Sequence, residues 1–280
     1  MNANCRAVTA TFRGHDTSDG AGVKLTRVLS PQDVRLADPF LLFDEFRSDR
    51  PEDYDAGFPP HPHRGFETVT YVMAGRMRHR DNHGNQGDLG PGSVQWMTAG
   101  RGIVHEEMPQ QERGLMWGYQ LWVNLPAARK MTAPRYQDVP ADRIPEVELP
   151  GGGKARVLAG LLEGVAGPVN EVAVEPAYLD VSLPAGGTLR WSPPEGHTVL
   201  LHGVEGEFTV GEDGRAFRAR EMALLSRTGD VAVKASGGGA RFLVIAGRPL
   251  GEPVVHHGPF VMNSREEILQ AIEDFQAGRF

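Results

Sequence analysis

Two short motifs contain the residue types that hold a metal ion. The first is His61-Pro62-His63, and the second runs from His105 to Glu107. Successive side chains of a β-strand point to opposite faces, so positions i and i+2 share a face. On strands, His61 and His63 would face one point, and so would His105 and Glu107. Three imidazoles and one carboxylate that meet inside a β-barrel predict a mononuclear metal site with room left for a substrate.

The same four groups also suit a closed, tetrahedral zinc site. Structural zinc sites usually contain cysteine, and this chain has a single cysteine, Cys5. Imidazole and carboxylate ligands without thiolate suit Fe(II), and also Mn, Co, Ni or Cu(II). We therefore expect one open transition-metal site, with Fe(II) as the first choice and Mn, Co, Ni, Cu or Zn as alternatives.

The charge and hydropathy of the chain argue against several classes of partner. The 280 residues carry a formal net charge of −7, and no basic run supplies the positive footprint that direct nucleic-acid binding needs. No apolar run approaches the ~20 residues of a membrane span, and the N-terminus lacks the apolar core of a signal peptide. A single cysteine fits a reducing compartment. We expect a soluble, cytoplasmic protein without direct contact to nucleic acid or membrane.

Strand-like segments dominate the chain and predict an all-β fold. Gly 35 and Pro 21 occur without a period, as in a protein with many tight turns. Thr68 and Thr198 begin similar stretches at an offset of 130 residues, which predicts a duplicated β domain. The clearest predicted strands are Phe66–Met77, Ser93–Met97, Gln120–Asn124, Leu179–Leu183, Thr198–Leu201, Glu207–Val210, Val231–Lys234 and Phe242–Ile245.

A proline-rich stretch marks the expected domain boundary. Residues 135–153 contain Pro140, Pro145 and Pro150 and end in three glycines, which predicts a linker between domains 1–134 and 154–280. Near the C-terminus, Ser264 and Glu267 form a capping box. Apolar residues at helical spacing follow, so we expect a helix over 264–277 that packs on the first barrel.

Longer motifs extend the analysis to a protein family. The run HPHRGFET resembles the first cupin motif, HxHxxxE, and His105 resembles the single histidine of the second. The runs HPHRGFETVTY, QWMTAGRGIVHEEMP, QLWVNLP, DPFLLFDEF and HHGPFVMN resemble the pirin family from about residue 20 to the C-terminus. The resemblance implies two tandem cupin barrels with metal in the N-terminal one only. Its ligands would be His61, His63, His105 and Glu107.

The fourth ligand has two candidates. The general cupin pattern nominates Glu67, and the pirin pattern nominates Glu107, which we favour. In the second half of the chain, His197 and His202 stand alone, five positions apart and on opposite faces of a regular strand. We therefore expect the C-terminal barrel to bind no metal and to act as a scaffold or a partner surface.

The resemblance implies a reaction, the oxygenation of the flavonol quercetin by O2, in which Glu107 would act as a general base. The predicted partners are then O2 and a small aromatic substrate, for which a tryptophan such as Trp122 is either a wall or part of the core. An alternative is a non-enzymatic, metal- or redox-responsive regulator that binds a transcription factor or a metabolic enzyme. A third is another small-molecule cupin enzyme, such as a metal-dependent isomerase.

Overall fold

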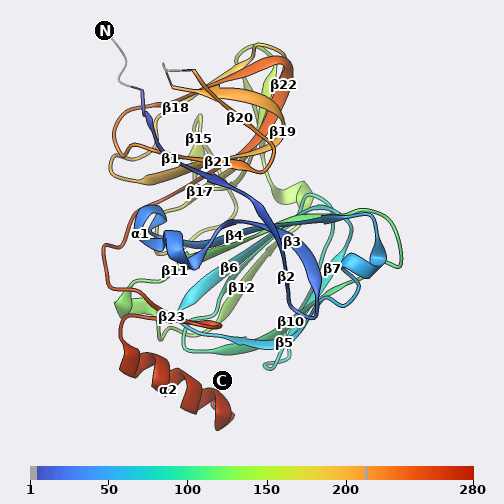
Figure 1. The fold of residues 1–280 in the computed structure, drawn as a ribbon, viewed down its shortest axis with the longest axis vertical. Coiled ribbons are helices and arrows are strands. Elements are labelled where there is room, and N and C mark those ends of the chain that lie inside the picture. The colour runs from blue at the N-terminus through green and yellow to red at the C-terminus, as the bar shows by residue number, and fades with distance from the viewer. Residues whose placement is uncertain (1–4, 212–213) are drawn as a thin grey trace. The chain divides into compact units, whose positions relative to one another are not determined.

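The computed structural model describes residues 5–211 and 214–280, which form two compact units (Figure 1). The first, here the histidine unit, contains His15–Leu36, Phe40–Ala141 and Leu250–Phe280. The second, here the apolar unit, contains the described residues of 1–14, Ala37–Pro39 and Asp142–Pro249. Both units consist mainly of antiparallel strands, as the sequence predicts.

The histidine unit has two main sheets. The first has the strand order β12-β9-β6-β11-β4-β3-β2, and the second has the order β5-β10-β7-β8. The strands of the first sheet are β12 (Arg135–Val139), β9 (Val94–Thr98), β6 (Phe66–Ala74), β11 (Met116–Asn124), β4 (Phe40–Ser48), β3 (Val23–Leu29) and β2 (His15–Asp19). Those of the second are β5 (Phe58–His63), β10 (Ile103–Pro109), β7 (Met77–Asp81) and β8 (Gln86–Leu89).

The C-terminal segment completes the histidine unit with a hairpin and a helix (Figure 1). Strands β23 (Val255–His257) and β24 (Phe260–Met262) pair with each other, and α2 (Arg265–Gln276) packs on them. The capping box of α2 is present: Ser264 Oγ accepts from the Glu267 amide. This confirms the predicted helix, within one residue at each end. A second, short helix is α1 (Val34–Ala37). Within the described ranges, no helix combines the length and apolar character needed to span a membrane.

The apolar unit is built on one large sheet whose interior side chains are apolar. Its path is β1-β21-β19-β22-β17-β14-β13, with β18 paired to β22 and β20 paired to β19. A large cluster that includes Leu201, Phe208, Phe242 and Val244 forms its core. The strands are β1 (Val8–Arg13), β13 (Glu146–Leu149), β14 (Gly153–Ala159), β17 (Ala177–Leu183), β18 (Thr188–Trp191), β19 (Thr198–Val210), β20 (Arg215–Arg218), β21 (Glu221–Leu225) and β22 (Val231–Gly247), and a small hairpin adds β15 (Leu161–Leu162) and β16 (Val165–Ala166).

The units differ from the predicted ranges 1–134, 135–153 and 154–280 because each unit includes one terminal segment of the chain that the prediction gave to the other unit. Residues 8–13 form β1, which pairs with β21 of the apolar unit, and residues 250–280 complete the histidine unit. The proposed linker also contains strands: β12 pairs with β9, and β13 pairs with β14. Both β12 and β13 end their sheets, and an edge strand tolerates the flanking prolines that suggested a linker. Residues 1–4 lie outside the described part of the chain.

Lys130 joins three separate segments of the histidine unit. Its buried ammonium group donates to the Gly65 carbonyl (2.8 Å), to Asn124 Oδ1 (2.7 Å) and to the Val261 carbonyl (2.9 Å). These acceptors follow β5, end β11 and lie on β24. Burial lowers the pKa of Lys130 to about 8. One side chain therefore fastens the turn after His63 to the C-terminal hairpin.

We expect Lys130→Met to destabilise the histidine unit by about 2–4 kcal/mol, because three buried oxygens would lose their donor. Urea unfolding measures this change. The exposed Lys24 of β3 supplies the control, and Lys24→Met should shift the midpoint little. An unfolding midpoint for Lys130→Met equal to that of the wild type would contradict the assigned role.

The lowered pKa of Lys130 also predicts a pH dependence. Below pH 8 the folded and unfolded chains both hold the Lys130 proton, so this group does not make the free energy of unfolding depend on pH. Between pH 8 and 10.5 only the unfolded chain holds it, so stability rises with pH relative to Lys130→Met, by up to about 3 kcal/mol. Urea unfolding of both proteins at pH 7.5, 9 and 10.5 checks this. A constant difference would show that Lys130 ionises normally in the fold.

Candidate metal centre

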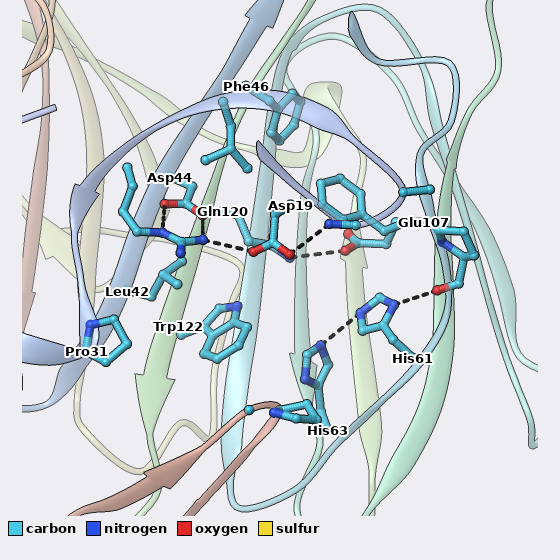
Figure 2. A pocket seen from close by; sticks show the side chains of 18 of the residues that line it. Asp19, Pro31, Leu42, Asp44, Phe46, His61, His63, Glu107, Gln120 and Trp122 are labelled. Carbon is cyan, nitrogen blue, oxygen red and sulfur yellow. Dashed lines mark hydrogen bonds and ion pairs between the residues drawn. The ribbon is translucent and has the colours of Figure 1, made fainter. Parts of the chain in front are cut away.

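The pairing of β5 with β10 brings the three predicted histidines together. His61 lies directly opposite His105, and His63 lies opposite Ile103, so all three imidazoles share one face of the sheet. One ligand nitrogen from each ring lies within 4.8 Å of the others. Figure 2 shows the rings of His61 and His63 directed toward each other. The predicted convergence of these residues is therefore present in the structure.

Prolines shape the strand that carries the first motif. The register shifts between the His61–His105 and Phe58–Glu107 pairs, so Pro59 and Pro60 form a bulge opposite a single residue of β10. Proline lacks the amide donor that a central strand needs, but β5 is an edge strand. The Pro59 carbonyl lies 2.8 Å from His61 Nδ1. The backbone of the bulge thereby fixes the orientation of the His61 ring.

The ring nitrogens have the protonation and spacing that a metal ion needs. With its Nδ1 hydrogen donated to Pro59, His61 presents the lone pair of Nε2, which lies 3.0 Å from His63 Nε2. Two ligand atoms that each lie about 2.1 Å from one ion, with a right angle between the two bonds, are about 3.0 Å apart. Among the described residues, neither ring nitrogen of the buried His105 has a hydrogen-bond partner. Buried polar atoms are normally paired, so these nitrogens fit a role as metal ligands.

Burial keeps the two inner imidazoles neutral. It lowers the pKa of His63 and of His105 well below the usual range, and the neighbouring His61 adds to both shifts. A neutral imidazole retains the lone pair with which it binds a metal. His63 and His105 can therefore bind a metal ion without losing a proton first.

Glu107 lines the same cavity, but other side chains hold its carboxylate. Its Oε1 lies 2.8 Å from Thr70 Oγ1, and its Oε2 accepts from Gln120 Nε2 at 3.1 Å. Thr70 Oγ1 also lies 2.6 Å from Gln120 Oε1. The cluster of converging ligand atoms consists of the three imidazoles. The structure thus gathers three of the four predicted ligands and places Glu107 beside them, hydrogen-bonded to β6 and β11.

Glu67 has a different environment and is not among the residues that line the cavity. Its Oε1 accepts from Thr98 Oγ1 at 2.7 Å, and burial raises its pKa. On β6 it has the opposite parity to Thr70, whose hydroxyl contacts Glu107. Gly65, at φ +89°, turns the chain between β5 and β6, so the strand parity of His63 does not extend to Glu67.

The cavity next to the histidines has a volume of about 620 Å³ and lies within the histidine unit. This size suits a small organic ligand. Trp122 lines the cavity, whereas two other tryptophans, Trp96 and Trp117, are buried in the core. The Trp122 ring lies 5.3 Å from that of His63. The other lining residues are Asp19, Gly20, Ala21, Leu25, Arg27, Pro31, Leu42, Asp44, Phe46, Phe58, Pro59, Pro60, His61, Glu107, Gln120, His256, Gly258 and Pro259.

The C-terminal hairpin supplies one wall of this cavity. The Val261 amide donates to the Arg64 carbonyl at 3.0 Å, directly after the first histidine motif. A Cβ on Gly65 would lie 2.0 Å from the Val261 carbonyl oxygen, so glycine allows this close approach. The Arg64 guanidinium also binds Asp274 of α2 at 2.7 Å. Residues distant in sequence thus hold the turn that follows His63.

A buried polar group lies beside Glu107. His79 lies opposite Glu107 in the β7–β10 register, and its Nε2 lies 2.8 Å from Asp138 Oδ2. Gln95 Nε2 donates to the other oxygen of Asp138 at 2.9 Å. A Cβ on Gly87 would lie 2.2 Å from His79 Nε2, so the neighbouring strand needs glycine there.

Comparison with known proteins shows which family the chain resembles in both halves. The pirin family model matches residues 22–123, and that of the pirin C-terminal cupin domain matches residues 178–280. A pirin-like protein of Caulobacter vibrioides is 50% identical over 98% of this chain and 99% of its own length. Human pirin is 40% identical over 97% of this chain and 92% of its own length.

A solved structure confirms the fold. The crystal structure of quercetin 2,3-dioxygenase from Acinetobacter baumannii has a TM-score of 0.92 and 35% identity, and the match covers 99% of both chains. The predicted all-β class with two cupin domains is therefore confirmed. With its family models, its relatives and its fold in agreement, this chain belongs to the pirin family.

Proposed function

We propose that this protein is a metal-dependent dioxygenase that cleaves a flavonol such as quercetin. The observation that carries the proposal is the convergence of three imidazoles, two of which, His61 and His63, line a cavity with aromatic walls. The cavity volume of about 620 Å³ exceeds the needs of O2 alone and suits an aromatic substrate of a few rings. The name of the Acinetobacter baumannii structure supports the same reaction.

The proposed metal ligands are His61, His63, His105 and Glu107, and the proposed metal is Fe(II). The orphaned nitrogens of His105 and the spacing of the other two rings favour a bound ion. Nitrogen and oxygen donors also accept Mn, Co, Ni, Cu or Zn. When bound, a redox-active ion would supply a Lewis acid for the 3-hydroxyl group of the flavonol and an electron-transfer partner for O2.

The side chains of the cavity have separate tasks in this proposal. Glu107 takes the proton of the substrate's 3-hydroxyl group on a carboxylate oxygen, as a general base. Thr70 and Gln120 orient that carboxylate through the hydrogen bonds described above. Trp122 and Phe58 form apolar walls that position the flat rings and exclude water.

Loss of one imidazole should release the metal. We expect the wild type to bind one first-row transition metal ion per chain and His105→Ala to retain well under half an equivalent after dialysis. Elemental analysis measures the content, and circular dichroism checks the fold. His83→Ala, which changes an exposed histidine of a turn, should keep the full equivalent. Full occupancy in His105→Ala would exclude the proposed ligand set.

We expect a change at Glu107 to lower turnover more than it lowers metal binding. With iron-loaded protein, we expect quercetin absorbance to fall with uptake of O2, and His61→Ala to abolish both. Glu107→Gln should retain a large share of the metal through the three imidazoles and lower kcat by about 10²-fold or more. Glu106→Gln is the matched control, because Glu106 has the opposite strand parity and should remain active.

The same assay separates the enzyme from a regulator. Stoichiometric metal binding without turnover of quercetin or of a related enediol would contradict the dioxygenase proposal. It would instead favour the metal- or redox-responsive regulator, which needs the ion but no substrate.

A further inference from the structure

A row of polar side chains crosses the floor of the cavity. Thr70 on β6 lies opposite Gln120 on β11, Gln120 lies opposite Asp44 on β4, and Asp44 lies opposite Arg27 on β3. Directly opposite residues of neighbouring antiparallel strands share a face, so these four side chains form one line across the sheet. The line begins at Glu107, which contacts Thr70 and Gln120.

Arg27 is the far end of this polar row. Its Nε and Nη2 donate to the two oxygens of Asp44 at 2.9 and 2.7 Å, and Nη2 also donates to Asp19 Oδ2 at 2.9 Å. Figure 2 shows Asp44 and the two histidines, His61 and His63, on different sides of the view, with Asp19 between them. The bidentate pair fixes the guanidinium plane. The hydrogen bonds to the two carboxylates use Nε and Nη2, which leaves Nη1 for a ligand.

Apolar side chains lie on both sides of the polar row and restrict the shape of a ligand. Trp122 lies opposite Leu42 on one side of the polar row, and Phe46 lies two residues beyond Asp44 on the other. All three line the cavity. Neighbouring strands are about 4.8 Å apart, so Gln120 and Arg27, two strands apart, are separated by about 10 Å. That distance matches an extended aromatic molecule of about three rings.

The charges of the far end exclude an anionic ligand group there. Asp44 and Asp19 carry two negative charges against the single positive charge of Arg27, and Glu107 adds another carboxylate at the near end. A neutral hydroxyl group avoids this repulsion. It can accept from Arg27 Nη1 and donate to the half-exposed Asp19.

We propose that Arg27 determines specificity by binding a hydroxyl group at the end of the flavonol remote from the histidines. This inference rests on the proposed function and adds a substrate class. The class is flavonols with a hydroxyl group on the ring that lies at the Arg27 end of the cavity, away from the metal-binding oxygens. Asp44 and Asp19 are positioning residues that hold the guanidinium in place.

Ligand affinity without turnover tests this assignment. Metal-loaded protein is titrated without oxygen with 3-hydroxyflavone and with its 4′-hydroxyl and 7-hydroxyl derivatives, and tryptophan fluorescence gives each Kd. We expect the wild type to bind one derivative about 10-fold more tightly than the parent compound. Arg27→Met should lose that preference and keep the affinity for the parent. Arg78→Met, which breaks the exposed pair with Asp88, should keep the preference.

The double variant Arg27→Met with Asp44→Asn avoids an unpaired buried carboxylate if the single variant folds poorly. It should also lose the preference. Equal weakening of all three ligands by either variant would show a merely structural role, and failure of the wild type to prefer or bind any derivative would overturn the proposal as well. Admitting oxygen to the complexes tests the proposed function separately: selective binding without turnover contradicts the dioxygenase and leaves the role of Arg27 intact.

Discussion

The register of β5 against β10 is the constraint on which the candidate site depends. His61 and His105 meet because they are directly opposite each other in this pairing. A slip of one residue would turn every imidazole of one strand to the other face of the sheet. The proline bulge before His61 and the Lys130 contacts after His63 hold β5 at both ends. Stability and the geometry of the three imidazoles are therefore coupled through the same short strand.

Much of this arrangement was predictable from local patterns. Side-chain parity placed His61 and His63 on one face, and the capping box located α2 within one residue. Strand parity does not continue through the turn at Gly65, so sequence alone kept Glu67 as the second candidate behind Glu107. The hydrogen bonds that hold Glu107 join β10 to β6 and β11, and no spacing along the chain encodes such pairings.

Both units are built from antiparallel strands, but the side chains inside them differ. In the apolar unit, predicted strands 198–201 and 207–210 form the single long strand β19, and register shifts near Gly203 and Gly206 bend it. Gly206 has φ +69°, a conformation that glycine adopts easily. Local composition marked the two ends of β19 but not their continuity. Packed apolar side chains fill this unit, whereas polar residues and a cavity occupy the corresponding strands around the histidines.

The exchange of chain ends has a consequence for biosynthesis. His256, Gly258 and Pro259 line the cavity, yet a ribosome adds them long after it has added His61 and His105. The nascent chain thus exposes the three imidazoles before their last wall exists. A metal ion captured at that time would meet an open, poorly selective set of ligands. At the proposed site, selection among ions would then depend on exchange after the hairpin has closed, or on the ions present during translation.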